Sequence, residues 1–549
     1  MNTLMEASDA SDIAPYPVQL VAVPVSVIFG LLLYSTLNAP DFINYDCAFY
    51  LLGSKLLLEG KQPMQNFVDL LPPIILYFAL PPWWFSKLMS IPIVTVWQGF
   101  VLASIYMSGF ASVAVLHQAT PSIGKLGDDI RRAWLAIGPL VTAFFLFQLT
   151  LGFHFGQREH LFILSYFPMF LLRWLRWHGS FTSKRKLVAA CLGVACGAIT
   201  YVKPQFLIIP TLVELALFLS SGHRQQWLNN IRAVELKTWA ITLGCCFLAS
   251  FAIPNIHEYY TRWVPFLSNG YAAYNAPSIM RLLMFNNPDG YLLGSVAIAL
   301  TVLLLCLILF RRSSLLPPLL AWTFGGLIIF VLQGRGWSYQ SIPCVAGFLL
   351  LAATLMQMLN YTLLNFLATK LKIASSITSK SHRFAIIMFL GWSIALIPMS
   401  PLLVKNSMVT GKTFASLNDL IDRETRRNDP VVILHTMLPY AHQLQLKKEL
   451  TPATRYVWCF PLRMTYYLKS KTETREAATA QEEKVVGEIV NDILGGKPKL
   501  VVIEAWATQP DGWTLARALE KHQFSQIALA DYEPRGLVNG CAIWKRRNP

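Results

Sequence analysis

Long apolar runs recur along this 549-residue sequence from residue 18 to residue 403. A helix that crosses the hydrocarbon core of a bilayer needs about 20 mainly apolar residues, so runs of this kind predict membrane spans. The predicted spans are 18–37, 93–117, 134–153, 161–178, 187–202, 206–221, 238–255, 291–310, 315–333, 342–366 and 384–403. We therefore expect a multi-pass α-helical membrane protein with about eleven transmembrane helices.

The composition supports this expectation. Charged residues make up only 14% of the chain, whereas soluble proteins carry about a quarter. The net charge of +16 could point to nucleic acid, but the basic residues stand in short clusters between the apolar runs. Such clusters are typical of membrane topology signals, so we expect no nucleic-acid partner.

The segment 74–90 is apolar but is interrupted by Pro81 and Pro82. We interpret it as an interfacial helix that lies on the membrane, and the alternative is a twelfth span. With eleven spans, the loops on the side of the N-terminal tail, 1–17, hold nearly twice as many Lys and Arg as the opposite loops. Because basic loops stay in the cytoplasm, this bias favours the interfacial interpretation and predicts a C-terminal domain on the outer side.

The pattern changes near residue 404, and 404–549 is expected to form an extracytoplasmic α/β domain. Strands are predicted at 431–435, 500–505, 526–532 and 537–545, and an amphipathic helix at 473–494. The domain has no phosphate-binding glycine loop, which argues against a nucleotide site. Cys459 and Cys541 would be able to pair as a disulfide in an oxidising compartment, although spacing alone does not decide pairing.

The first predicted outside loop, 38–92, is long and rich in polar residues. Asp46 follows the first span, and a short amphipathic helix is expected at about 47–59. An acid that is fixed at the membrane surface beside an interfacial helix is suited to a lipid-linked substrate.

This arrangement resembles the GT-C superfamily of membrane glycosyltransferases that use polyprenyl-phosphate sugars, including protein O-mannosyltransferases and the aminoarabinose transferases of lipid A. The resemblance covers the membrane part, 18–403, and the outside domain. The matching residues are Asp46, Tyr50, Gly60, Pro63, Asp69, Pro72 and Pro73. Cys47 stands where many relatives have a second acid, which argues against a mechanism that needs two adjacent carboxylates.

The resemblance implies transfer of a sugar from a polyprenyl-phosphate donor to a lipid, glycan or protein acceptor at the outer face of a bacterial inner membrane. Asp46 would be the general base, with Asp69 as a further catalytic acid and Tyr50 and Lys61 as substrate contacts. A base contributes typically about 10²–10⁴-fold to the rate. The alternative for Asp46 is a solvated or helix-capping side chain.

Three other outside loops carry candidate phosphate or sugar ligands, because cations and hydrogen-bond donors stabilise a departing phosphate. The candidate ligands are His154 and Arg158 in one loop, Lys203 in the second, and Arg335, Trp337 and Tyr339 in the third. Glu159, next to Arg158, is a candidate catalytic residue that would orient Arg158 or act as a second acid. Each loop also has a structural interpretation. Arg158 and Glu159 would form a local ion pair, Lys203 would extend to the membrane surface, and Trp337 and Tyr339 would be ordinary interfacial aromatic residues.

No cofactor is expected, because His154 and His160 lack a third ligand at a defined spacing, although a divalent metal stays a minor alternative. A transporter, a lipid-linked polysaccharide flippase or polymerase, and an inactive scaffold are the competing functions. Transporters commonly place ionisable residues near the middle of the membrane, whereas here the charges stand mainly at the ends of the runs.

Overall fold

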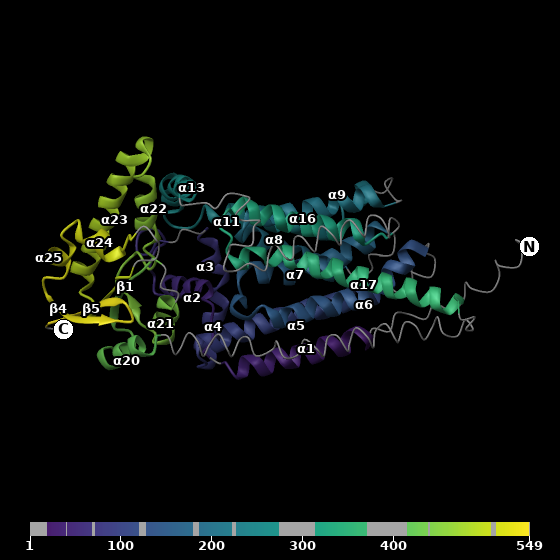
Figure 1. Ribbon diagram of the computed structural model, residues 1–549, viewed down its shortest axis with the longest axis horizontal. Helices are drawn as coiled ribbons and strands as arrows, with labels where there is room; N and C mark the ends of the chain where they lie inside the picture. Colours follow the sequence, from purple (N-terminus) through teal and green to yellow (C-terminus); the bar gives the residue numbers. More distant parts are fainter. Residues whose placement is uncertain are drawn as a thin grey trace, which may run out of the picture. The chain divides into compact units, whose positions relative to one another are not determined.

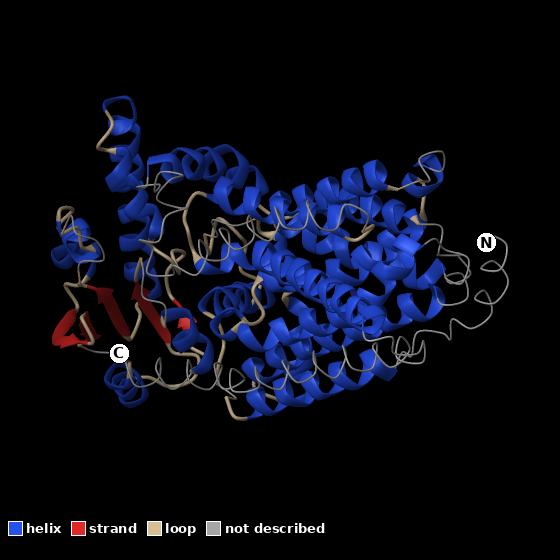
Figure 2. Cartoon of the chain, turned by 45° about the vertical axis from the view of Figure 1, so that its right-hand side comes forward, coloured by secondary structure: helices blue, strands red, loops and turns tan. Residues whose placement is uncertain are grey.

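The computed structural model describes residues 19–39, 41–68, 72–119, 128–178, 186–221, 227–273, 313–370, 414–436, 440–506 and 512–547. These residues are mainly helical and divide into two compact units (Figures 1 and 2). Unit 1 comprises Met1–Asn38, Gly99–Cys246 and Pro277–Leu403, and unit 2 comprises Ala39–Gln98, Phe247–Ala276 and Val404–Pro549. The predicted tail 1–17, the predicted spans 291–310 and 384–403, and Asp69 lie outside the described residues.

The described residues of unit 1 are mainly helical (Figure 1). The helices are α1 (Gln19–Leu37), α5 (Ile93–Ala119, which begins in unit 2), α6 (Asp128–Thr150), η2 (Gly152–His154), α7 (Arg158–Trp177), α8 (Lys186–Val202), η3 (Pro204–Leu207), α9 (Ile208–Ser220), α10 (Trp227–Ile231), α11 (Val234–Ser250, which ends in unit 2), α16 (Leu316–Gln333), η6 (Ser338–Ser341) and α17 (Ile342–Lys370). The described predicted spans thus fall largely on helices, except that the span predicted at 238–255 is helical only as far as Ser250.

Three helical stretches among the described residues are long and apolar enough to cross a membrane: Ile93–His117, Leu316–Gln333 and Ser338–Leu359. Shorter apolar helices occur in the same part of the chain at Ala22–Leu37, Ala136–Thr150, Lys186–Val202 and Pro204–Ser220. These helices indicate an association with a membrane. The eleven-span arrangement and the outer location of the C-terminal domain stay predictions.

Small residues bring the helices of unit 1 into close contact. Gly193 and Gly197 form a Gly-x-x-x-Gly pattern on α8, where an added Cβ would lie 2.2 Å from the Glu235 carbonyl oxygen and 2.7 Å from that of Trp239. On α16, a Cβ at Gly326 would lie 2.5 Å from the backbone of Cys344 in α17. Membrane helices commonly pack through small residues, because burial from lipid supplies no hydrophobic driving force.

A buried ion-pair network joins α7, α9 and α11. The Arg173 guanidinium donates to both oxygens of Glu214 (2.6 and 2.8 Å) and to Glu235 at 2.6 Å. Arg176 Nη2 donates to Glu235 Oε2 at 2.8 Å, and Trp177 Nε1 donates to Glu214 Oε2 at 2.9 Å. Two arginines face two carboxylates, so the network is neutral. Removing one partner would leave a buried charge without its counterion.

Unit 2 contains short helices and a mixed sheet (Figure 2). Its helices are α2 (Tyr45–Leu58), α3 (Ile74–Phe78), α4 (Leu80–Met89), α12 (Ile256–Glu258), the π-helix η5 (Tyr259–Trp263), α13 (Val264–Ala273), α20 (Ala415–Glu424), α21 (Ala441–Lys447), α22 (Phe460–Leu468), η8 (Thr472–Thr474), α23 (Arg475–Gly496), α24 (Leu515–Glu520) and α25 (Phe524–Ala528). Its strands are β1 (Pro430–Leu434), β2 (Thr451–Pro452), β3 (Leu500–Glu504), β4 (Tyr532–Val538) and β5 (Cys541–Arg546).

The strands follow the order β2-β1-β3-β5-β4, in which β1 is parallel to β2 and β3, and β5 is antiparallel to β3 and β4. β1 and β3 are almost continuously buried, which explains why both were recognisable as apolar strands. The strand predicted at 526–532 is wrong, because α25 occupies Phe524–Ala528 and the strand begins only at Tyr532. Cys459 and Cys541 are both buried and neither is in a disulfide.

The segment predicted to be interfacial forms two short helices, α3 and α4, with a break at Ala79. Neither is long enough to span a bilayer, which needs about 20 residues. On α4, Trp83 is buried, whereas Trp84, Phe85, Leu88 and Met89 are exposed, Leu88 to 79%. A short helix with an exposed apolar face is suited to the membrane interface.

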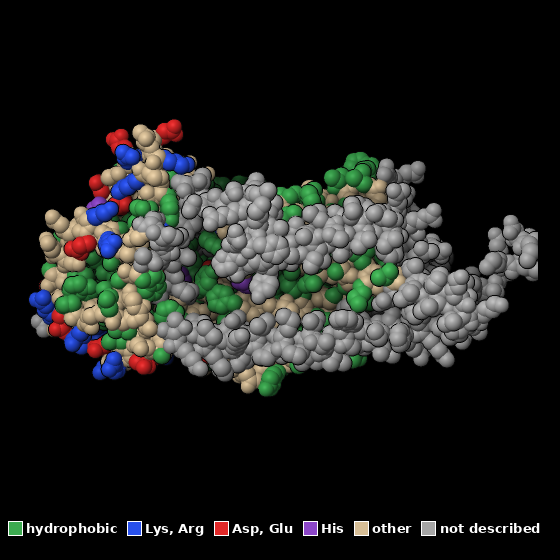
Figure 3. All heavy atoms as spheres, viewed as in Figure 1, with side chains coloured by type: hydrophobic (Ala, Val, Ile, Leu, Met, Phe, Trp, Pro, Cys, Tyr) green, Lys and Arg blue, Asp and Glu red, His purple; other side chains and the backbone are tan. Residues whose placement is uncertain are grey.

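The visible charged side chains gather on the C-terminal part of unit 2, and the visible side chains of unit 1 are largely hydrophobic (Figure 3). This contrast is expected if the C-terminal part lies in water and the helices of unit 1 lie in lipid.

The network makes a stability prediction. We expect Glu235→Ala to lower the free energy of unfolding of the detergent-solubilised chain by about 3–5 kcal/mol, because Arg173 and Arg176 would lose a fully buried counterion. Thermal unfolding, followed by circular dichroism, measures the change. Glu483→Ala, on an exposed position of α23, is the matched control and should unfold like the unmodified chain. Equal unfolding temperatures for the two variants would contradict the prediction.

Candidate functional site

Lys203 stands at a break between two helices of unit 1. α8 ends at Val202, Lys203 is extended with φ −144° and ψ 92°, and Pro204 begins η3. Proline excludes helical geometry from the residue before it, so the break follows from the sequence. Lys203 is only 8% exposed, whereas a lysine that extends to the membrane surface would expose its ammonium group.

The Lys203 ammonium is bound by polar and aromatic groups from other helices. Its Nζ contacts the carboxylate of Glu159 at the start of α7 and the side-chain oxygen of Gln333 at the end of α16. The same atom lies 5.6 Å from the centre of the Tyr339 ring and 5.7 Å from that of Phe206. A cation that is desolvated in this way is stabilised by the carboxylate and by the negative faces of the two rings.

The start of α7 supplies three successive ionisable residues, Arg158, Glu159 and His160, and all three are buried. An acid in the first turn is stabilised by the helix dipole, and here Glu159 also has Lys203 as a partner from another helix. His160 Nδ1 accepts a hydrogen bond from the backbone N–H of Gly156 at 2.9 Å, which fixes the orientation of the ring. Glu159 thus forms an ion pair with Lys203, and its predicted catalytic role stays a prediction.

The loop between α16 and η6 completes this cluster. Gly334 and Gly336 have positive φ angles of 61° and 68°, and Arg335 lies between them. Ser338 Oγ and His154 Nε2 are 3.0 Å apart, and the Tyr339 ring lies 6.3 Å from the His154 ring and 5.8 Å from the Trp337 ring.

Three separate loops thus meet in one buried polar cluster of unit 1, which we call the Lys203 cluster. Its contacts bring together five unit 1 residues that were predicted to bind substrate or act in catalysis: His154, Glu159, Lys203, Trp337 and Tyr339. The other two predicted residues of unit 1, Arg158 and Arg335, belong to the same segments of the chain, next to Glu159 and between Gly334 and Gly336. Gln333 and Ser338 were not predicted from the sequence. The only feature that could have indicated them is that each is a polar residue close to the end of an apolar run. A lysine ammonium held in a fixed position makes the cluster suitable for an anion such as a phosphate group.

Asp46 belongs to unit 2, in the first turn of α2. The cap of this helix is Asn44, whose side-chain oxygen accepts a hydrogen bond from the backbone N–H of Asp46 at 2.8 Å. Asp46 is therefore not the capping residue, and its carboxylate is half-buried at the end of the helix. Tyr50 follows one turn later and is buried, whereas Lys61 is exposed in the loop after the helix.

The rest of unit 2 holds α2 from two directions. On one side, Trp83 Nε1 donates to the Leu51 carbonyl at 2.7 Å, and Ser54 Oγ donates to the Leu76 carbonyl at 2.6 Å. On the other side, Lys55 Nζ donates to the Glu449 carbonyl at 3.1 Å. These bonds join α2 to α3 and α4 and to the C-terminal part of the chain.

Helix α21 contacts the start of α2, where Asp46 lies. The Gln443 amide donates to the carbonyl of Ile43, and the His442 ring packs 5.0 Å from the Phe49 ring. This contact joins positions that are 400 residues apart in the sequence. The C-terminal part therefore orients the segment that presents Asp46.

His442 also pairs with a second buried histidine, His435, which directly follows β1. The two ring centres are 4.8 Å apart, and His442 Nε2 lies 3.3 Å from the Val457 carbonyl oxygen. Burial lowers the pKa of His435 well below its ordinary value and lowers the pKa of His442 to about 4. Both rings are therefore neutral at pH 7.

Within the described part of the chain, no three His, Cys, Asp or Glu side chains are grouped so that they could hold a metal ion. The ionisable residues Glu214 and Glu235 were not singled out in the sequence, although Glu214 lies inside the predicted span 206–221. Their partners are arginines, which explains why they form an ion-pair network and not a metal site.

Comparison of the sequence with known proteins finds no matching protein family and no similar curated protein. The chemistry of the chain must therefore be inferred from its own residues.

The histidine pair predicts a pH dependence of stability. Folding lowers the pKa of His442 from 6.5 to about 4. Between pH 6.5 and pH 4, His442 is therefore protonated in the unfolded chain and neutral in the folded chain. The stability contributed by a neutral His442 is thus present above pH 6.5 and should fall by about 1.4 kcal/mol per pH unit as the pH drops toward 4.

Thermal unfolding at a series of pH values between 7 and 4.5 measures this slope. His442→Gln should flatten the slope, whereas His257→Gln, at an exposed position of the same unit, should leave it unchanged. An unaltered slope in the His442 variant would show that this ring is not the group responsible.

Proposed function

We propose that the chain is a membrane glycosyltransferase that moves a sugar from a polyprenyl-phosphate donor to a lipid, glycan or protein acceptor. The proposal places the reaction at the outer face of a bacterial inner membrane. The observation that carries it is the convergence of three loops in the Lys203 cluster, where the Lys203 ammonium is held in a fixed position by Glu159, Gln333 and two aromatic rings. An enzyme that releases a lipid phosphate needs such a preorganised cationic site.

In this proposal, Asp46 removes the proton from the acceptor hydroxyl. The acceptor oxygen then forms a bond to the anomeric carbon, and the bond between that carbon and the phosphate oxygen breaks. The electron pair of the broken bond remains on the departing phosphate, whose negative charge is stabilised by cationic side chains. A single displacement of this kind inverts the configuration at the anomeric carbon.

The position of Asp46 supports its assignment as the base. Asn44 is the N-cap residue of α2, and Asp46 lies in the first turn of the helix, where an acid is stabilised by the helix dipole. The contacts of α2 with α4 and with α21 restrict the movement of the helix that carries it. A positioned carboxylate is more effective than a mobile one, because little orientation is lost on reaching the transition state.

A transporter is the second candidate. The observation that favours it is the buried network of Arg173, Arg176, Glu214 and Glu235, because ionisable groups among membrane helices often line ion or proton pathways. The network is neutral and its members are paired with one another, which favours a structural role. Uptake of substrate into vesicles, without any transfer of sugar, would support transport over glycosyl transfer.

The proposal predicts that Asp46→Asn reduces sugar transfer by about 10²–10⁴-fold, because asparagine cannot accept the proton of the acceptor. The assay uses the full chain in liposomes with radiolabelled polyprenyl-phosphate hexoses, tested one at a time, and a bacterial envelope extract as acceptor. Asp41→Asn removes an exposed acid just before α2 and should retain activity.

Circular dichroism should show that both variants are folded. Full activity in the Asp46 variant would remove this residue from the mechanism. A complete lack of transfer by the unmodified chain with every donor would contradict the glycosyltransferase proposal itself.

A further inference from the structure

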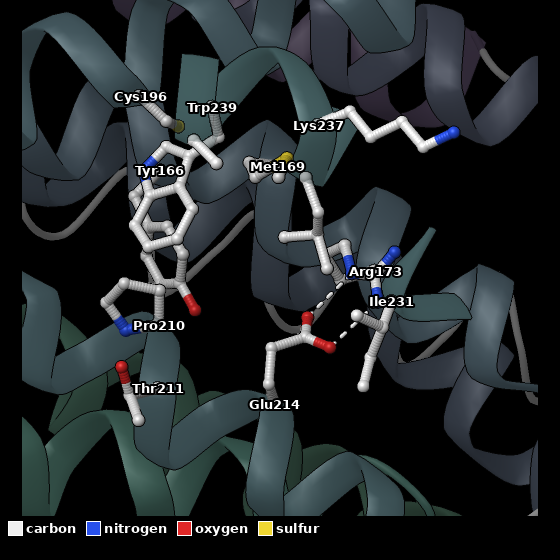
Figure 4. Close-up of a pocket in the computed structure, with 12 residues that line it drawn as sticks. Tyr166, Met169, Arg173, Cys196, Pro210, Thr211, Glu214, Ile231, Lys237 and Trp239 are labelled. Carbon is white, nitrogen blue, oxygen red and sulfur yellow. Dashed lines mark hydrogen bonds and ion pairs between the residues drawn. The ribbon is translucent and has the colours of Figure 1, made fainter. Parts of the chain in front are cut away.

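A cavity of about 420 Å³ lies among α7, α8, α9, α10 and α11 in unit 1 (Figure 4). Its walls are mainly apolar and include Tyr166, Met169, Cys196, Pro210 and Trp239. Ligand pockets in proteins typically measure about 300–1,000 Å³ and are largely apolar with a few polar groups. The cavity is thus large enough for part of a small ligand, and its chemistry favours a hydrocarbon.

The charged pair that lines the cavity, Arg173 and Glu214, is hydrogen-bonded within the protein. Glu214 accepts both bonds from Arg173 and a third from Trp177, and Figure 4 shows the Glu214–Arg173 pair facing each other beside the cavity. Because this pair is neutral and its hydrogen bonds are made within the protein, it creates no demand for a charged ligand. The part of a ligand that enters the cavity is therefore expected to be uncharged.

The mouth of the cavity opens among apolar side chains that face outward. Thr211 and Ala240 line the cavity and are exposed, and the nearby side chains of Leu215, Leu219 and Ile241 are also exposed, Ile241 to 63%. Exposed apolar side chains on neighbouring helices are expected where a protein faces lipid. A ligand that reaches this mouth would come from the bilayer.

Near the cavity lie residue types that commonly contact lipid headgroups. The short helix α10 exposes Trp227, Leu228 and Ile231, and Ile231 also lines the cavity. Two exposed cations, Arg232 and Lys237, follow, and the stem of Lys237 lies along the cavity with its ammonium directed away from Glu214 (Figure 4). Tryptophan and basic residues are enriched where membrane proteins contact lipid headgroups.

We propose that this cavity binds one acyl chain of an anionic phospholipid and that Arg232 and Lys237 bind its phosphate group. The apolar walls accept the chain, and the neutral Arg173–Glu214 pair creates no demand for a second charge. Lys237, which lines the cavity, and Arg232, which directly follows the lining residue Ile231, select a negative headgroup. The site uses residues that are separate from Asp46 and from the Lys203 cluster, so it does not depend on the proposed glycosyl transfer.

Native mass spectrometry of the full chain in a non-ionic detergent tests this site, with phosphatidylglycerol and phosphatidylcholine as probes. We expect at least about five-fold stronger binding of phosphatidylglycerol, and a loss of about five-fold in Lys237→Gln and in Arg232→Gln. Ala240→Phe should reduce binding of both lipids, because the ring would fill the entrance. Lys484→Gln, which removes an exposed lysine from α23, should bind like the unmodified chain.

Because Lys237, Arg232 and Ala240 are exposed, these variants should fold, and their unfolding temperatures check this. Equal binding of the two lipids, or unmodified binding by Ala240→Phe, would overturn the proposal. Displacement of phosphatidylglycerol by an equimolar amount of polyprenyl phosphate would overturn the assignment to a phospholipid, because the site would then belong to the carrier lipid.

Discussion

The contact between α21 and the start of α2 determines how this chain presents its candidate base. Asp46 lies in a first turn that is capped by Asn44, and the adjoining Ile43 carbonyl is bound by Gln443 from the C-terminal part of the sequence. The bond between Lys55 and the Glu449 carbonyl attaches the later part of the same helix. A 14-residue helix is marginally stable in water by itself, so these tertiary contacts are required to fix its position. The C-terminal part is therefore a structural component of the segment that carries Asp46.

The helices of unit 1 are organised by a different constraint. In lipid, apolar surfaces gain little from burial against one another, so close backbone contacts and satisfied polar groups have to hold the helices together. The close backbone contacts occur at Gly193, Gly197 and Gly326. The satisfied polar groups are those of the ion-pair network around Arg173. The resulting framework keeps the start of α7, the break at Lys203 and the end of α16 close enough for Glu159 and Gln333 to bind one ammonium group. The same framework leaves the cavity between α9 and α11 open.

Much of the local structure could be predicted from the sequence, because length and apolar pattern determine it. The predicted helices at 47–59 and 473–494 and the strands at 431–435 and 500–505 correspond to α2, α23, β1 and β3. The strand predicted at 526–532 failed because a short apolar run does not distinguish a helix turn from a strand, and α25 lies there. The contacts of Gln333, Ser338 and Gln443 could not be predicted, since each depends on which distant segments meet in three dimensions. The candidate residues of the Lys203 cluster were identified one by one, whereas their convergence is a result of the fold.

The central claim is that the segment containing Asp46 and the C-terminal part of the chain form one folded unit at the outer face of the membrane. Labelling of single cysteines with a thiol reagent that does not cross the inner membrane tests it most directly, with peptide mass spectrometry to separate native cysteines. The account predicts that Lys61→Cys, after α2, and Arg427→Cys, before β1, both react in intact bacterial cells, because both positions are exposed in unit 2. Reaction of either position only after the inner membrane is permeabilised would contradict the account.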